Sequence, residues 1–170
     1  MKRLVGLYLL FLTACSGGIP GNGSLVPDSP PPARLVIGGQ EQESGIGSYC
    51  WSGSNPEAAI CADMIGLPTP RQPLRVEAPF TAGLILPLEE APTWLSVNWI
   101  LAEADMRLEF TTPDQLFWHP YGGEELAADM AIENEFEIEA QPGLYLMTVF
   151  VGWERHGDVS YGFLVDVTAP

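Results

Sequence analysis

The chain is poor in basic residues and has no long apolar run. Its 170 residues include seven lysines and arginines against 22 aspartates and glutamates, a formal net charge of -15. Such a chain repels phosphate, so no nucleic-acid partner is expected. A spanning helix needs about 20 consecutive apolar residues, and none is present in the sequence. Hydrophobic residues still make up 46% of the chain, too many for a disordered acidic protein, which predicts one folded domain.

Residues that commonly carry catalysis are also scarce. The sequence has two histidines and three cysteines, and it lacks the GxSxG, HExxH and EF-hand patterns. His156 and Asp158 could pair as a base and its orienting carboxylate, but the glycine between them favours a turn. We therefore expect no catalytic residue, no cofactor and no enzymatic activity. So acidic a chain contains many pairs of carboxylates, and their abundance is no evidence for a hydrolytic site. The sequence does not exclude such a site, and a small hydrolase stays as an alternative.

The first fifteen residues have the pattern of an export signal. Lys2 and Arg3 are positively charged, and the apolar stretch Leu4–Leu12 is too short to span a bilayer. The next residues complete Leu12-Thr13-Ala14-Cys15, which resembles the lipobox of bacterial lipoproteins. The resemblance implies cleavage before Cys15, transfer to its thiol of a diacylglyceryl group whose acyl chains are of the palmitate type, and anchoring to the bacterial membrane outside the cytoplasm. An ordinary signal peptide with a chance cysteine is the alternative.

Residues 16–33 have the composition of a tether. This segment contains four glycines, five prolines and three serines, which cannot bury enough apolar surface to fold. Fully extended, it reaches roughly 60 Å. The sequence thus predicts a signal peptide over residues 1–14, a lipidated cysteine and tether over residues 15–33, and a folded domain over residues 34–170. Once residues 1–14 are removed, five arginines face 22 acidic residues, a charge of -17.

Two cysteines remain once Cys15 is assigned to the lipid. Cys50 and Cys61 would lie in an oxidising compartment, which predicts a disulfide between them. A metal or redox site is the alternative, but the pair has no CxxC spacing and no nearby histidine. The disulfide would close a loop rich in turn-forming residues.

From residue 34 onward, the apolar residues alternate with a period of two and are interrupted by proline and glycine. This pattern predicts β-strands. The expected strands are Arg34–Gly38, Leu74–Ala78, Leu84–Leu86, Trp94–Ala102, Met106–Phe110, Leu144–Trp153 and Val159–Val167. In the fourth, Leu95, Val97 and Trp99 share one face. The last two strands form a long hairpin, with Gly157 supplying the freedom for its turn.

Two segments contain good helix formers, Asn55–Ile65 and Glu124–Asn134, and each could form a short helix. The spacing of short strands and turns nevertheless predicts an all-β protein, an antiparallel β-sandwich with at most one or two short helices. The C-terminal hairpin resembles the last two strands of immunoglobulin-like or fibronectin-like bacterial surface domains. The chain resembles an uncharacterised lipoprotein family, and the resemblance implies no activity.

Aromatic residues are the main hint of binding. The loop sequence Phe117-Trp118-His119-Pro120-Tyr121 could present an aromatic platform to a sugar ring, with Trp51 in the disulfide loop as a further contact. Alternatively, Phe117 and Trp118 cover the end of the core. Trp94, Trp99 and Trp153 are expected in the core.

A run of alternating carboxylates is the only hint of metal. Glu133, Glu135, Glu137 and Glu139 would share one face of a strand. A solvated face that discourages edge-to-edge aggregation is favoured over a weak calcium site.

Taken together, these sequence features predict a lipoprotein that binds an envelope glycan or a protein partner without catalysis, with a structural spacer of the envelope as the alternative.

Overall fold

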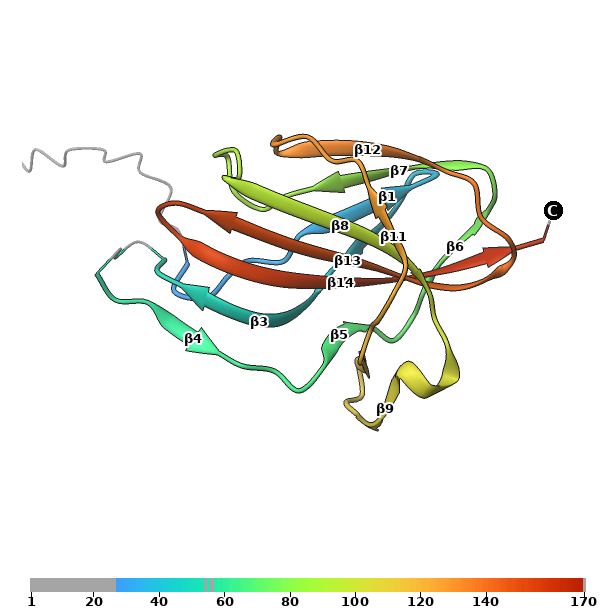
Figure 1. The fold of residues 1–170 in the computed structure, drawn as a ribbon, viewed down its shortest axis with the longest axis horizontal. Helices are drawn as coiled ribbons and strands as arrows, with labels where there is room; N and C mark the ends of the chain where they lie inside the picture. The colour runs from blue at the N-terminus through green and yellow to red at the C-terminus, as the bar shows by residue number, and fades with distance from the viewer. Residues whose placement is uncertain (1–26, 54, 56, 170) are drawn as a thin grey trace, which may run out of the picture.

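The computed structural model describes residues 27–53, 55 and 57–169, which fold almost entirely into β-strands (Figure 1). Within these residues the one helical element is a 3-10 turn, η1 (Ala104–Met106). The strands are β1 (Arg34–Ile37), β2 (Gln40–Glu43), β3 (Gly45–Trp51), β4 (Ile60–Ala62), β5 (Leu67–Pro70), β6 (Leu74–Glu77), β7 (Phe80–Ile85), β8 (Trp94–Leu101), β9 (Arg107–Thr111), β10 (Gln115–Trp118), β11 (Glu124–Leu126), β12 (Glu133–Ile138), β13 (Gly143–Trp153) and β14 (Gly157–Thr168).

The strands form three sheets. Sheet A has the order β12-β7-β1-β2, and sheet C has the order β5-β10-β9. Sheet B has the order β11-β8-β13-β14-β3-β4, and β6 adds to it by pairing with β14. Every pairing is antiparallel except that of β6 with β14. The prediction of an all-β sandwich is confirmed.

The main core lies between sheets A and B, and it is built by alternation along the strands. The inward side chains of β13 are Tyr145, Met147, Val149, Val151 and Trp153, and those of β14 continue the same layer. Alternation along the predicted strand Leu144–Trp153 places these five side chains of β13 on one face, as the structure has them. Removing such side chains from water is the main stabilising contribution to a sandwich of this size.

The turn of the C-terminal hairpin depends on Gly157. Trp153 pairs with Gly157, so three residues connect β13 to β14. Gly157 has a φ of 89°, and a Cβ atom there would collide with the carbonyl oxygen of Cys50. Only glycine satisfies both conditions without strain. The predicted hairpin and the role of its glycine are both confirmed.

Sheet C packs on the outer face of sheet B, away from the main core. Glycines make the close approach possible, because a Cβ atom on Gly45 or Gly162 would collide with the carbonyl oxygen of Pro68 in β5. A second, smaller core fills this contact. Its buried members are Ile100, Met106, Leu116, Trp118, Leu146 and Leu164. Sheet C covers only part of sheet B, and the remainder of that outer face is open.

Neither of the two segments that could form a short helix is helical in the described residues. Glu124–Asn134 contains strand β11 and the beginning of β12, and β11 pairs with β8 through Glu124 and Trp99. In the described part of Asn55–Ile65, the regular element is strand β4, which pairs with β3. Pairing with a neighbouring strand outweighs the modest helix propensity of such short segments. Alternation along the expected strand Met106–Phe110 also predicts that Phe110 points inward with Met106, and this is wrong, since the Phe110 side chain is 46% exposed.

The last part of the predicted tether belongs to the folded domain. We call residues 27–33 the strap. The Trp51 indole Nε1 donates to the Pro27 carbonyl oxygen at 2.9 Å, and the Tyr161 hydroxyl donates to the Pro31 carbonyl oxygen at 2.9 Å. Ala33 is fully buried. The domain therefore includes the strap and does not begin at residue 34, while residues 1–26, with the predicted signal peptide and Cys15, lie outside the described residues.

The predicted disulfide is present. Cys50 in β3 and Cys61 in β4 are bonded, and the two residues are directly paired across the strands. The bond closes the loop that follows Trp51 and ties the edge strand β4 to sheet B. Closing a loop of this length contributes roughly 3 kcal/mol in the chain-entropy account.

Candidate functional site

The structure buries two of the aromatic residues that the sequence placed in a binding loop. Phe117 and Trp118 lie in β10 with exposed fractions of 4% and 3%. The Trp118 indole Nε1 donates to the Thr69 hydroxyl at 2.9 Å in a buried hydrogen bond. Phe117 packs against Phe110 with ring centroids 4.5 Å apart. These rings therefore hold sheet C together and offer no stacking face, which corrects the expectation of a platform here.

His119 and Tyr121, which follow β10, are exposed. The Tyr121 hydroxyl donates to the Asp105 carboxylate at 2.9 Å. The hydrogen bond to Asp105, together with the nearby Glu103 charge, raises the pKa of Tyr121 to about 12. Without Phe117 and Trp118 beside them, His119 and Tyr121 do not form a continuous aromatic surface.

Trp51 is also buried, at the end of the sandwich where the strap lies. Its ring meets Trp153 edge-on at 5.8 Å and stacks on His156 at 5.7 Å. His156 Nδ1 is 3.0 Å from the Gly53 carbonyl oxygen, and its Nε2 is 3.9 Å from a Glu90 carboxylate oxygen. Trp51 is therefore a core residue and not a ligand contact. His156 is engaged by Gly53 and Glu90 instead of Asp158, which fits the turn interpretation.

The alternating glutamates lie where the favoured interpretation placed them. In β12, an edge strand of sheet A, Glu133, Glu135 and Glu137 are exposed while Phe136 and Ile138 are buried. Across the described ranges, no three His, Cys, Asp or Glu side chains lie close enough to share a metal ion. The geometry thus adds no support to a calcium site at these glutamates or at Glu139.

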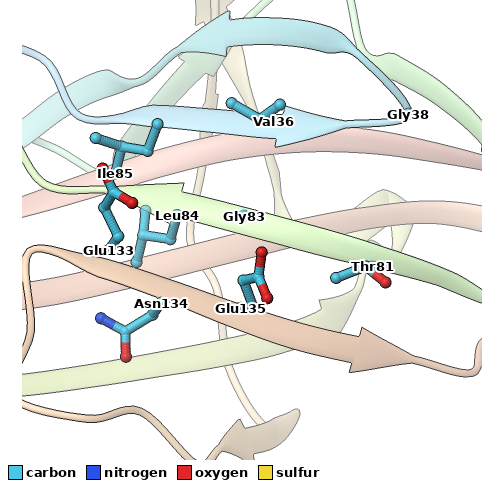
Figure 2. A pocket seen from close by; sticks show the side chains of 9 residues that line it. All are labelled: Val36, Gly38, Thr81, Gly83, Leu84, Ile85, Glu133, Asn134 and Glu135. Carbon is cyan, nitrogen blue, oxygen red and sulfur yellow. The ribbon is translucent and has the colours of Figure 1, made fainter.

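A shallow hollow of about 340 Å³ lies on the outer face of sheet A. Figure 2 shows that Gly83 occupies its middle, with Val36 of β1 on one side and Glu135 of β12 on the other. The hollow exists because Gly83 has no side chain to fill it. A Cβ atom at this position would fit, since it would meet no neighbour closer than 3.7 Å. Of the polar residues that line it, Glu133 and Glu135 are exposed, and the buried Asn134 accepts from the Asp129 amide and donates to the Ala131 carbonyl oxygen, so we assign the hollow no ligand.

An exposed aromatic pair lies on the open part of the outer face of sheet B. Trp94 and Phe150 are 45% and 41% exposed. Trp94 pairs with Gly152, and a Cβ atom on Gly152 would collide with the Trp94 Nε1 and lie 2.5 Å from Cε2 and 2.9 Å from Cδ1. The indole therefore lies over Gly152, so that backbone covers part of the ring while much of it stays exposed.

Polar side chains surround this pair. Ser96 pairs with Phe150 across β8 and β13, and its hydroxyl donates to Glu125 at 3.4 Å. Asn98 Nδ2 donates to the Ser96 hydroxyl at 3.3 Å. Asp158 pairs with Gly152 from the other side and is exposed. We call this surface the Trp94 face; its members are Trp94, Ser96, Asn98, Phe150, Gly152 and Asp158.

Sequence reasoning missed this surface although the signal was available. Leu95, Val97 and Trp99 were correctly expected to share the inner face of β8, and all three pack in or against the main core. Strict alternation then places Trp94 on the opposite face. Trp94 was nevertheless expected in the core because it is large and apolar, and the structure corrects that expectation. Trp99 and Trp153 are buried as expected.

Comparisons with family models, curated proteins and solved structures found no match to this chain. In the part of the chain that the structure describes, no helix has both the length and the apolar character needed to cross a bilayer.

Proposed function

We propose that this chain is a lipoprotein anchored to a bacterial membrane outside the cytoplasm, and that its β-sandwich is a non-catalytic binding module. The anchor is supported by the sequence of the first fifteen residues, in which the apolar stretch ends at the first residue of Leu12-Thr13-Ala14-Cys15. Two or more acyl chains on Cys15 give stable anchoring, whereas one gives only marginal binding. The disulfide between Cys50 and Cys61 is consistent with an oxidising compartment.

The binding role is supported by one observation, the Trp94 face. Two large aromatic side chains exposed together on a sheet, with polar groups around them, are typical of interaction surfaces. A protein that served only as a spacer would have no use for an indole held over Gly152 with its outer surface in water. The two histidines give no comparable support to catalysis, because His156 is engaged by Gly53 and Glu90 and His119 is an exposed loop residue.

The anchor can be tested by changing the cysteine. The full chain would be produced in a bacterial host with labelled palmitate, alongside Cys15→Ala and, as a matched control, Ser16→Ala. We expect the original chain and Ser16→Ala to carry label and to partition into a detergent phase, and Cys15→Ala to carry none. Equal labelling of Cys15→Ala would overturn the anchor, and a mature chain that does not begin at Cys15 would indicate an ordinary signal peptide.

A further inference from the structure

We infer that the Trp94 face binds a neutral glycan, with one sugar ring stacked on the Trp94 indole and the next residue of the sugar chain over Phe150. The inference rests on the proposed binding function and names its ligand class. It starts from the position of the two rings. Trp94 and Phe150 belong to adjacent paired strands and point to the same side of sheet B, about 7 Å apart along the strand direction.

The indole of Trp94 is already held against the backbone of Gly152. Gly152 is the residue opposite it, and any larger residue there would displace the ring. The apolar C–H face of a pyranose ring can therefore stack on the indole without ordering it first. Burying two apolar faces against each other removes both from water, and a preorganised ring keeps the entropic cost of binding low.

The polar side chains around the rings match the hydroxyl groups of a sugar. Ser96, Asn98 and Glu125 form a chain of hydrogen bonds beside Phe150, and Asn98 and Glu125 keep free hydrogen-bonding capacity. Asp158 offers carboxylate acceptors on the other side of Gly152. A lipid surface or an apolar protein patch would leave these groups desolvated and unpaired, whereas a sugar can both donate to them and accept from them.

The charge of the surface selects a neutral sugar. The Trp94 face has no lysine or arginine, it includes the carboxylate of Asp158, and Glu125 borders it on the opposite side. The whole chain carries 22 acidic residues against seven basic ones. Uronic acids, phosphate-containing polymers and anionic lipids would be repelled by these charges, at short range through the bordering carboxylates and at longer range through the field of the molecule.

The test is calorimetric titration of the purified full chain in detergent micelles. The probes are three neutral hexasaccharides, namely α-linked glucose, β-linked glucose and N-acetylglucosamine, with hexagalacturonate as their anionic counterpart. We expect saturable binding of at least one neutral hexasaccharide and none of hexagalacturonate. Trp94→Ala should weaken that binding about ten-fold or more, as is usual for a central aromatic anchor. Gly152→Ala should also weaken it, because it displaces the indole without removing it.

The matched control is Tyr121→Ala, which removes a ring of similar exposure (49%) that lies outside the Trp94 face. It should leave the affinity unchanged. The glycan assignment is overturned if no neutral hexasaccharide binds or if Trp94→Ala binds as tightly as the original chain. The binding module itself would fail only if a photo-reactive residue at position 150 also formed no cross-link in intact cells, so the two failures can be told apart.

Discussion

At the scale of single residues, the most informative side chain is Tyr161. It lies at the centre of the main core with an exposed fraction of 0%, yet its hydroxyl reaches the strap and donates to the Pro31 carbonyl oxygen. Burial disfavours the charged phenolate and raises the pKa of Tyr161 far above its ordinary value of 10.0. One residue thus links the hydrophobic core, the strap and the response of the protein to alkali.

The consequence is a loss of stability at high pH. Below pH 10.0, the ordinary pKa of tyrosine, residue 161 is protonated in both states. Above it, the unfolded chain releases the proton while the folded chain keeps it, so stability falls by up to roughly 1.4 kcal/mol per pH unit from this group. The free energy of unfolding, measured by urea denaturation at several pH values between about pH 9 and pH 11, should fall less steeply with pH for Tyr161→Phe than for the original chain. An equally steep fall in both chains would contradict the assignment of this pH dependence to Tyr161, whatever the stability of the variant at neutral pH.

At the scale of elements, the C-terminal hairpin depends most strongly on one position. Gly157→Ala should destabilise the protein by about 2 kcal/mol or more, because the turn holds residue 157 at a positive φ that a Cβ disfavours, and because the new Cβ also collides with the Cys50 carbonyl. Gly122→Ala is the control, since its φ is also positive at 67° but nothing lies within 4 Å of the added Cβ. The stabilities of the two variants would be compared through their midpoints of denaturant unfolding. A loss no larger for Gly157→Ala than for Gly122→Ala would exclude the collision.

The strands that could be predicted from the sequence are those with a clear period of two. β1, β6, β8, β13 and β14 begin and end within one or two residues of their expected bounds. The two expected helices failed because β11 and β4 are short strands that form by pairing with β8 and β3. Such pairing partners are distant in the sequence and leave no local signal.

The candidate site was harder to predict for a related reason. Phe117 and Trp118 have the composition of a loop around them, and only the packing of sheet C on sheet B shows that they are buried. Trp94 shows the opposite error, since size suggested burial and alternation suggested exposure. Between the two signals, alternation was the reliable one because β8 is a regular strand paired on both sides.

At the scale of the whole molecule, the strap makes the domain larger than its sequence pattern suggested. A chain that begins at Arg34 loses the carbonyl partners of Trp51 and Tyr161, and each buried donor left unpaired costs about 1–3 kcal/mol. We therefore expect the chain of residues 34–170 to unfold at clearly lower urea concentration than the chain of residues 27–170. The latter should match the full chain, and equal midpoints for all three would show that the strap contributes nothing.

The strap also sets how far the domain can travel from the proposed anchor. Because residues 27–33 lie against the sandwich, the proposed anchor at Cys15 would be joined to the domain by the eleven residues 16–26, whose length even in a fully extended chain is at most about 36 Å. The strap begins beside Gly53, at the end of the sandwich that carries the β13–β14 turn and the first residue of β8 (Figure 1). If the proposed anchor and the proposed glycan binding both hold, a domain attached at this end would stay in a thin layer next to the membrane, and Trp94 would meet only those sugars whose chains enter that layer.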